Sequence, residues 1–151
     1  MVGVSNSSYI LDNSTTITNM TNLGNGAYRA VAYNGVRFVC VGDSGNTRQS
    51  TNGTSWNALT GLIASNDYYS PVAYGTKFLT IDNVTLRAYE IISGSTTWQF
   101  DNSLPATIQT PRQIAYGNGV LVVGTNSNNT TYIGYNTTNV LTYRALTTQG
   151  V

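Results

Sequence analysis

Three apolar stretches of similar length recur at regular intervals along the chain. They cover residues 38–41, 78–81 and 120–123, and nearly every position in them is apolar. A strand that is covered on both faces has this pattern, whereas a strand with one solvent face alternates. Each stretch follows an Ala-Tyr dipeptide and a glycine-containing turn, and the dipeptides at Ala32, Ala73 and Ala115 are spaced by 41 and 42 residues. The pattern predicts three hairpins, each with a first strand, a tight turn and a buried second strand.

A second pattern follows each of these hairpins. The segments 50–56, 93–98 and 135–140 are short and polar, and each ends in a large side chain. These side chains are Trp56, Trp98 and Val140, which lie 42 residues apart. We interpret each segment as a second hairpin turn against which the large side chain packs. A unit therefore contains four strands, and the third and fourth strands alternate between apolar and polar positions.

The remaining N-terminal residues match only part of a unit. Residues 9–17 resemble the second half, with Ile17 standing 39 residues before Trp56. The chain then divides into a half unit, 1–27, and three whole units, 28–67, 68–110 and 111–151. No stretch has helical periodicity, and Pro111 interrupts the one candidate, residues 107–113. We predict a single all-β domain built from these repeats.

The segment from Ser50 to Trp56 carries a family resemblance. With the strand of pattern Phe-Val-x-Val-Gly before it, this segment resembles the Asp-box hairpin of sialidase-type and related β-propeller repeats, Ser-x-Asp-x-Gly-x-x-Trp. Asn52 stands in the usual position of the aspartate, and the turn is one residue shorter. The resemblance implies three and a half propeller-like four-stranded blades, in which Ser50, Asn52 and Trp56 stabilise a peripheral turn and bind no ligand.

Three and a half blades do not close a ring, since propellers usually have about four to eight. Open sheet faces favour aggregation, so we expect another chain to cover them. The cover is either further copies of this chain or the surface of a larger protein on which an open arc docks. A β-trefoil, with three four-stranded units, is the alternative fold, although it leaves residues 1–27 without a place.

Composition narrows the range of partners. Charged residues make up 9% of the chain, where soluble domains average about 25%, and Asn, Thr and Ser together exceed a third. A net charge of +1 offers no basic patch, so we expect neither nucleic acid nor an anionic membrane as a partner. The hydrophobic content of 40% argues against disorder. We see no signal peptide at the N-terminus and no membrane span, and we expect synthesis in a cytoplasm.

The chain has few groups that could perform catalysis. It has no histidine, its single glutamate is Glu90, and its single cysteine, Cys40, lies inside a buried strand. The aspartates are too far apart for a calcium loop. Asp43 and Asp82 follow equivalent strands and could share a role at the rim, but two turn-forming side chains are the simpler interpretation. We predict no enzyme activity, cofactor or metal site, and the sequence assigns no ligand-binding residue.

The sequence leaves several functions open. The first is a structural protein of a larger assembly, such as a decoration, head-fibre or tail protein of a phage virion assembled in the host cytoplasm, with itself or other virion proteins as partners. The second is a carbohydrate-binding module for neutral glycans, with exposed aromatic rings that stack on sugars. Its candidate rings belong to Tyr28, Tyr68, Tyr69, Tyr89, Tyr132 and Tyr135. A propeller assembly factor that binds another protein is a third function, usually associated with a full ring.

Overall fold

The computed structural model describes the backbone of residues 2–4, 7–11, 20–85, 88–92, 94–101, 111–125, 131–137 and 140–146. Within these ranges the chain consists of β-strands and one short 3-10 turn, η1 (Asp43–Gly45). The prediction of an all-β chain is confirmed.

The strands form four antiparallel sheets, and in each sheet the strands follow one another in chain order. Sheet I contains β1 (Val2–Val4), β2 (Ser7–Leu11) and β3 (Met20–Asn25). Sheet II contains β4 (Tyr28–Tyr33), β5 (Phe38–Gly42), β6 (Thr47–Ser50) and β7 (Asn57–Ala58). Sheet III contains β8 (Tyr68–Tyr74), β9 (Lys77–Asp82), β10 (Ala88–Ile92) and β11 (Gln99–Asp101). Sheet IV contains β12 (Pro111–Gly117), β13 (Val120–Thr125), β14 (Thr131–Thr137) and β15 (Val140–Leu146).

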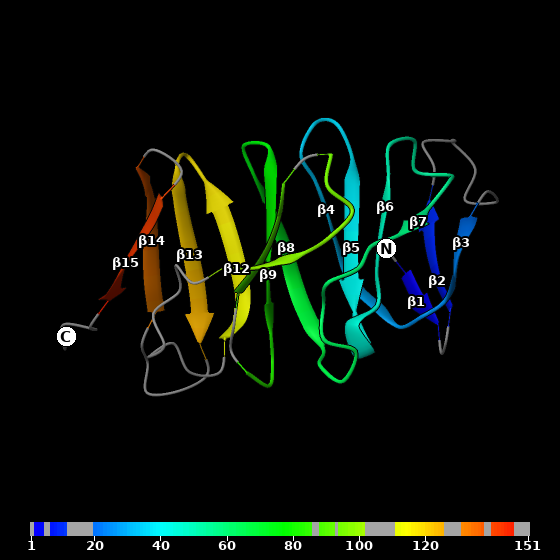
Figure 1. Ribbon diagram of the computed structural model, residues 1–151, viewed down its shortest axis with the longest axis horizontal. Helices are drawn as coiled ribbons and strands as arrows, with labels where there is room; N and C mark the ends of the chain where they lie inside the picture. The colour runs from blue at the N-terminus through cyan, green and yellow to red at the C-terminus, as the bar shows by residue number, and fades with distance from the viewer. Residues whose placement is uncertain are drawn as a thin grey trace.

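The sheets stand side by side in a row that runs from sheet I to sheet IV (Figure 1). The first strands of sheets II, III and IV, which are β4, β8 and β12, lie next to one another. Each of these strands is an edge of its own sheet, so the three first strands together form one side of the row.

The apolar second strands are covered on both faces, as their sequence pattern predicts. On β5, Val39 and Val41 pack between sheets II and III, whereas Cys40 faces the other way and packs with Leu23 of sheet I. On β9, Phe78 joins the cluster with sheet II, and Leu79 and Ile81 join the cluster with sheet IV, whose members include Leu121 and Val123. Alternate side chains of one strand thus supply the contacts on both sides of a sheet.

Sheet I is larger than the half unit expected from the sequence. It has three strands, because Val2–Val4 pair with residues 7–9 and add β1 to the sheet. β3 follows Ile17 in the sequence as β7 follows Trp56. By this correspondence β1, β2 and β3 take the places of the second, third and fourth strands of a unit. The described part of sheet I has no equivalent of the first strand.

A backbone link joins sheets II and III. After β7 the chain passes beside the segment that precedes β11, and Thr60 pairs with Thr97 in parallel. The Thr60 amide donates to the Thr96 carbonyl (3.0 Å), and the Thr60 carbonyl accepts from the Trp98 amide (2.8 Å). Gly61 follows with φ +92, and a Cβ there would lie 2.2 Å from the Trp98 carbonyl oxygen. Glycine is therefore required for this close passage.

Candidate functional site

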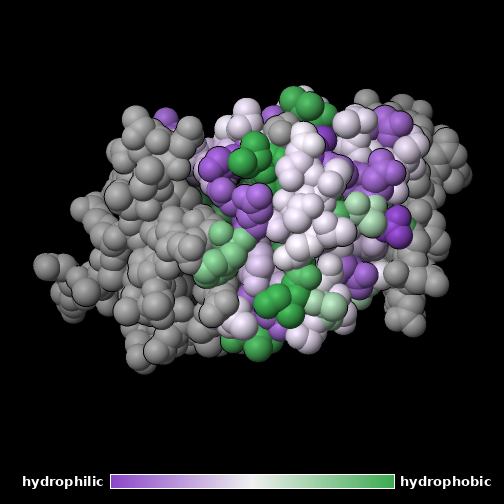
Figure 2. Space-filling view, in the orientation of Figure 1, coloured by the Kyte–Doolittle hydropathy of each residue, from purple (hydrophilic) through white to green (hydrophobic). Residues whose placement is uncertain are grey.

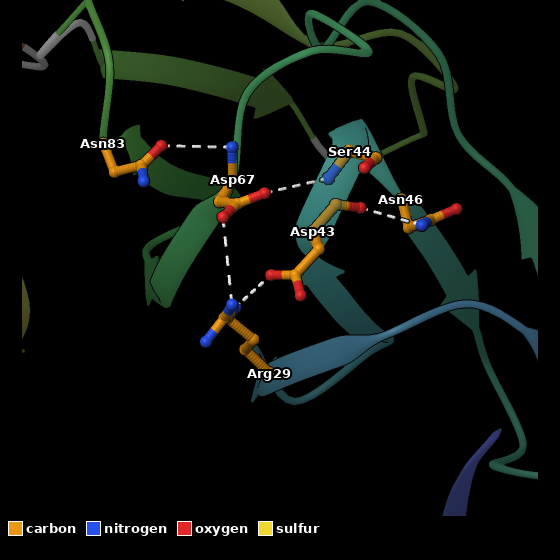
Figure 3. A network of polar contacts seen from close by, with 6 residues as sticks. All are labelled: Arg29, Asp43, Ser44, Asn46, Asp67 and Asn83. Atoms are coloured by element: carbon orange, nitrogen blue, oxygen red, sulfur yellow. Dashed lines mark hydrogen bonds and ion pairs between the residues drawn. The ribbon is translucent and has the colours of Figure 1, made fainter. Parts of the chain in front are cut away.

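The junction of sheets II and III has a polar network at one end (Figure 3). Arg29, on β4, donates through Nε to Asp43, and its Nη2 lies 3.8 Å from Oδ2 of Asp67. Asp67 in turn accepts from the Ser44 amide (3.1 Å), while its own amide donates to Oδ1 of Asn83 (3.1 Å). The network connects η1 of sheet II with the residues that flank β8 and β9 of sheet III.

This network is well suited to hold two sheets together. The hydrogen bond to Asp43 raises the pKa of the Arg29 guanidinium, which also lies over the ring of Tyr69 at 4.8 Å. The Arg29 side chain is 43% exposed, so water weakens its ion pairs. Both carboxylates face the Arg29 guanidinium, so charge attraction as well as hydrogen bonding connects the two sheets here.

Asp43 and Asp82, which follow equivalent strands, have different structural roles. Asp43 pairs with Arg29. Asp82 is completely buried, and its carboxylate accepts from the amides of Val84 (2.9 Å) and Thr85 (2.5 Å). The turn-forming interpretation is confirmed for Asp82, whereas Asp43 forms an ion pair with Arg29 inside sheet II.

The opposite end of the junction contains a pocket of about 330 Å³. Its lining includes Val36 and Arg37 from the β4–β5 turn, Gln49 from β6, Ser55 and Asn57 beyond it, and Gly94 from the β10–β11 turn. At this pocket a cavity meets a buried charge, because Arg37 is only 4% exposed.

Arg37 crosses from sheet II to sheet III. Its Nη1 donates to Oε1 of Gln49 and to the carbonyl of Ser95 (2.9 Å), and its Nη2 donates to the carbonyl of Ile92 (2.9 Å). The guanidinium lies over the ring of Phe78 at 5.4 Å. Burial lowers the pKa of Arg37, but a guanidinium keeps its charge in proteins. The repeat pattern does not mark Arg37, because the arginines do not occupy equivalent positions in the units.

The turn from Ser50 to Trp56 is closed by its own side chains. Oγ of Ser50 accepts from the Gly53 amide (2.8 Å), and Oδ1 of Asn52 accepts from the amides of Thr54 (3.0 Å) and Ser55 (2.9 Å). The indole of Trp56 donates to the Gly53 carbonyl (2.9 Å). Since these polar atoms are used inside the turn, they stabilise it and are not available to a ligand.

The four candidate tyrosines whose side chains the structure describes do not form a common surface for sugar stacking. Tyr28, Tyr68 and Tyr89 are buried, so their rings cannot stack on a ligand. The hydroxyl of Tyr28 accepts from Nε of Arg48 (2.7 Å), and that of Tyr68 accepts from the Ile63 amide (2.9 Å). Tyr69 is half-buried beneath Arg29. The side chains of Tyr132 and Tyr135 lie outside the described residues.

Among the described residues, the single glutamate of the chain is engaged by other side chains. Glu90 accepts from Nζ of Lys77 (2.9 Å) and from the hydroxyl of Tyr74 (3.1 Å). In the described part of the chain, His, Cys, Asp and Glu form no group of three that could hold a metal ion. The described segments also contain no helix with the length and apolar character needed to span a bilayer.

We expect Cys40 to resist thiol reagents in the folded protein. Burial raises the pKa of this thiol to about 12, and reagents attack the thiolate. In the unfolded chain the pKa returns to about 8.5, so modification at pH 8 should be at least about a hundredfold faster in urea. Release of thionitrobenzoate from Ellman's reagent measures both rates on the single cysteine of the chain. Equal rates would show that Cys40 is accessible.

Comparison with solved structures identifies the architecture, although comparison with known protein families and with curated proteins finds no match. The structure described as YCF48 bound to D1 peptide superposes with a TM-score of 0.66 and 16% identity, over 96% of this chain and 44% of that one. Human WBSCR16 superposes with a TM-score of 0.59 and 14% identity, over 83% of this chain and 39% of that one. The chain folds as a partial β-propeller.

The propeller architecture explains the arrangement of the sheets. Each four-stranded sheet is a blade, and the first strands β4, β8 and β12 are the inner strands of three consecutive blades. The expected fold class is confirmed, and the β-trefoil alternative is set aside. The chain spans less than half the length of either solved chain.

Proposed function

We propose that this chain is a non-enzymatic structural protein of a larger assembly, and that a second copy of the chain completes its ring. The observation that carries the proposal is the open row of sheets. Sheets I and IV stand at opposite ends of the row (Figure 1). On β13, Leu121 and Val123 are buried against sheet III, whereas Val120 and Val122, which alternate with them, are only half-buried. On β13, this outer face is therefore less covered than the face that meets sheet III.

The lengths of the solved neighbours support two copies. Almost the whole of this chain matches 44% of one of them, so two chains span about one such protein. Two partial propellers of this size would bring the blade number to about seven, within the usual range of about four to eight. Charged residues make up 9% of the chain, and a surface with few charges suits association with neutral partners. On the described part of the visible face, the apolar residues form small, separate clusters (Figure 2).

The more specific parts of the proposal rest on composition and on the turn at 50–56. We propose that this turn is an Asp-box hairpin in which Asn52 replaces the aspartate, since Oδ1 of Asn52 accepts from the amides of Thr54 and Ser55. The low charge and the abundance of Asn, Thr and Ser support a virion decoration, head-fibre or tail protein. The neighbour solved with a bound peptide supports a polypeptide partner. Glycan binding has weaker support, because Tyr28, Tyr68 and Tyr89 are buried.

Native mass tests the proposal directly. At micromolar concentration we expect size-exclusion chromatography with light scattering to give the mass of two chains. Val122→Lys places a charge on the outer face of sheet IV and should yield a folded monomer, since an unpaired charge opposes burial. Val84→Lys is the matched control, because Val84 is 62% exposed in the turn after β9, and it should stay dimeric. A monomeric wild-type protein would contradict the proposal.

A further inference from the structure

The pocket at the junction of sheets II and III contains a buried cation that lacks an anion. Arg37 is 4% exposed, and no carboxylate of the described residues lies within ion-pair distance of it. Its Nε atom is buried without a hydrogen-bond partner. Its neighbours are an amide oxygen and two backbone carbonyls, which are neutral acceptors. Burying an uncompensated charge costs free energy, so an anion bound beside Arg37 would stabilise the site.

The repeat shows which partner is missing. Arg37 and Lys77 occupy equivalent positions, immediately before the phenylalanine of the second strand. Strand register makes Gln49 and Glu90 equivalent as well, since Gln49 is opposite Val39 and Glu90 is opposite Leu79.

The same two positions have different charges in the two sheets. In sheet III, Nζ of Lys77 lies 2.9 Å from a carboxylate oxygen of Glu90, so the charges cancel. In sheet II the corresponding pair is Arg37 with Gln49, which leaves one positive charge beside the pocket. The glutamine therefore stands where the repeat elsewhere supplies a carboxylate.

We infer that this pocket binds a carboxylate group of a partner polypeptide, either an acidic side chain or a chain terminus. A planar guanidinium matches a carboxylate in shape and charge. Among the described lining residues Arg37 is the one cation, and a single charge suits a monoanion better than a phosphate dianion. Ser55 and Asn57 add neutral hydrogen-bonding groups, and Val36 adds an apolar wall. The inference is independent of ring closure, because the pocket lies within one chain.

Two carboxylate probes test the inference on the full chain. Propionate mimics an acidic side chain, and N-acetylglycine mimics a chain terminus. At constant ionic strength we expect one arginine Nε–Hε signal in nitrogen-15 NMR spectra to shift saturably with either probe. The probe that binds more tightly shows whether the natural carboxylate belongs to an acidic side chain or to a chain terminus. Propionamide, which is neutral, should cause no shift. An equal shift with propionamide, tighter binding of inorganic phosphate, or no saturable shift would each overturn the inference.

The variant Gln49→Glu supplies the missing carboxylate from within the chain. The substitution replaces the side-chain amide group by a carboxylate of the same shape. Arg37 then faces a carboxylate, as Lys77 faces Glu90 in sheet III. We expect it to weaken binding of both probes by at least about tenfold, because the internal carboxylate competes for Arg37. Val84→Glu is the matched control, since it adds the same charge at an exposed turn of sheet III and should bind the probes as the wild type does. Undiminished binding to Gln49→Glu would place the carboxylate elsewhere and overturn the inference.

Discussion

Replacing Trp98 with alanine is expected to lower the free energy of unfolding by about 4 kcal/mol, as for other large aromatic side chains removed from a core. Trp98 is 2% exposed and belongs to the cluster between sheets II and III, with Val39 and Val41 of β5 on one side. Its indole donates to Oγ1 of Thr47 in sheet II (3.1 Å). The change therefore leaves a cavity at an interface between blades and removes a hydrogen bond across it.

Urea denaturation followed by circular dichroism measures this loss. Trp98→Phe keeps most of the volume and loses the hydrogen bond, so its cost should be smaller, about 1–2 kcal/mol. Trp56→Ala is the comparison at the equivalent position of the repeat. Because Trp56 is half-buried and its indole bonds within its own turn, we expect a cost below that of Trp98→Ala. A loss under about 1 kcal/mol for Trp98→Ala would contradict the packing described here.

Gly42→Ala is expected to lower the free energy of unfolding by about 3 kcal/mol, the upper end of the usual cost of overpacking. Gly42 ends β5 with an extended backbone, φ −166, which any residue adopts, so the penalty is steric. A Cβ at this position would lie 1.9 Å from the carbonyl oxygen of Ala27 and 2.7 Å from Cα of Tyr28. The backbone at Ala27 cannot easily move away from a new Cβ, because its carbonyl accepts from the Asp43 amide (2.8 Å).

The control for this prediction is another strand glycine. Gly117, in β12, has open space around its Cβ direction. Gly117→Ala should therefore be neutral or slightly stabilising, since alanine loses less backbone entropy on folding. Thermal and urea denaturation of the two variants against the wild type give the comparison. Equal stabilities for the two alanine variants would show that the crowding at Gly42 relaxes without cost.

The strand arrangement was predictable because the buried second strands have a distinctive composition. Val39 packs toward sheet III and Cys40 packs toward sheet I, so both positions need an apolar side chain. β1 was missed for the opposite reason. Val2–Val4 form a three-residue strand with two apolar side chains, and such a short segment has no detectable periodicity.

The candidate site was less predictable from sequence. Alternation shows which tyrosines share a face of a strand, but whether another sheet covers that face depends on tertiary packing, as the burial of Tyr68 shows. Arg37 could have been found by comparing it with Lys77, since both precede the phenylalanine of a second strand. Equivalence is hidden here because one position holds an arginine and the other a lysine. The absence of a carboxylate beside Arg37 is harder to predict, because it depends on the strand register that places Gln49 opposite Val39.

The pairing of Thr60 with Thr97 has a consequence for how the molecule unfolds. The outer edge of sheet II is continuous, through backbone hydrogen bonds, with the segment that leads into β11. Fraying of sheet III would break these bonds and free the end of sheet II, so the two blades should open as one cooperative step. In repeat proteins, stability is approximately the sum of the repeats and their nearest-neighbour interfaces. Here the interface includes main-chain bonds, so we expect sheets II and III to unfold together.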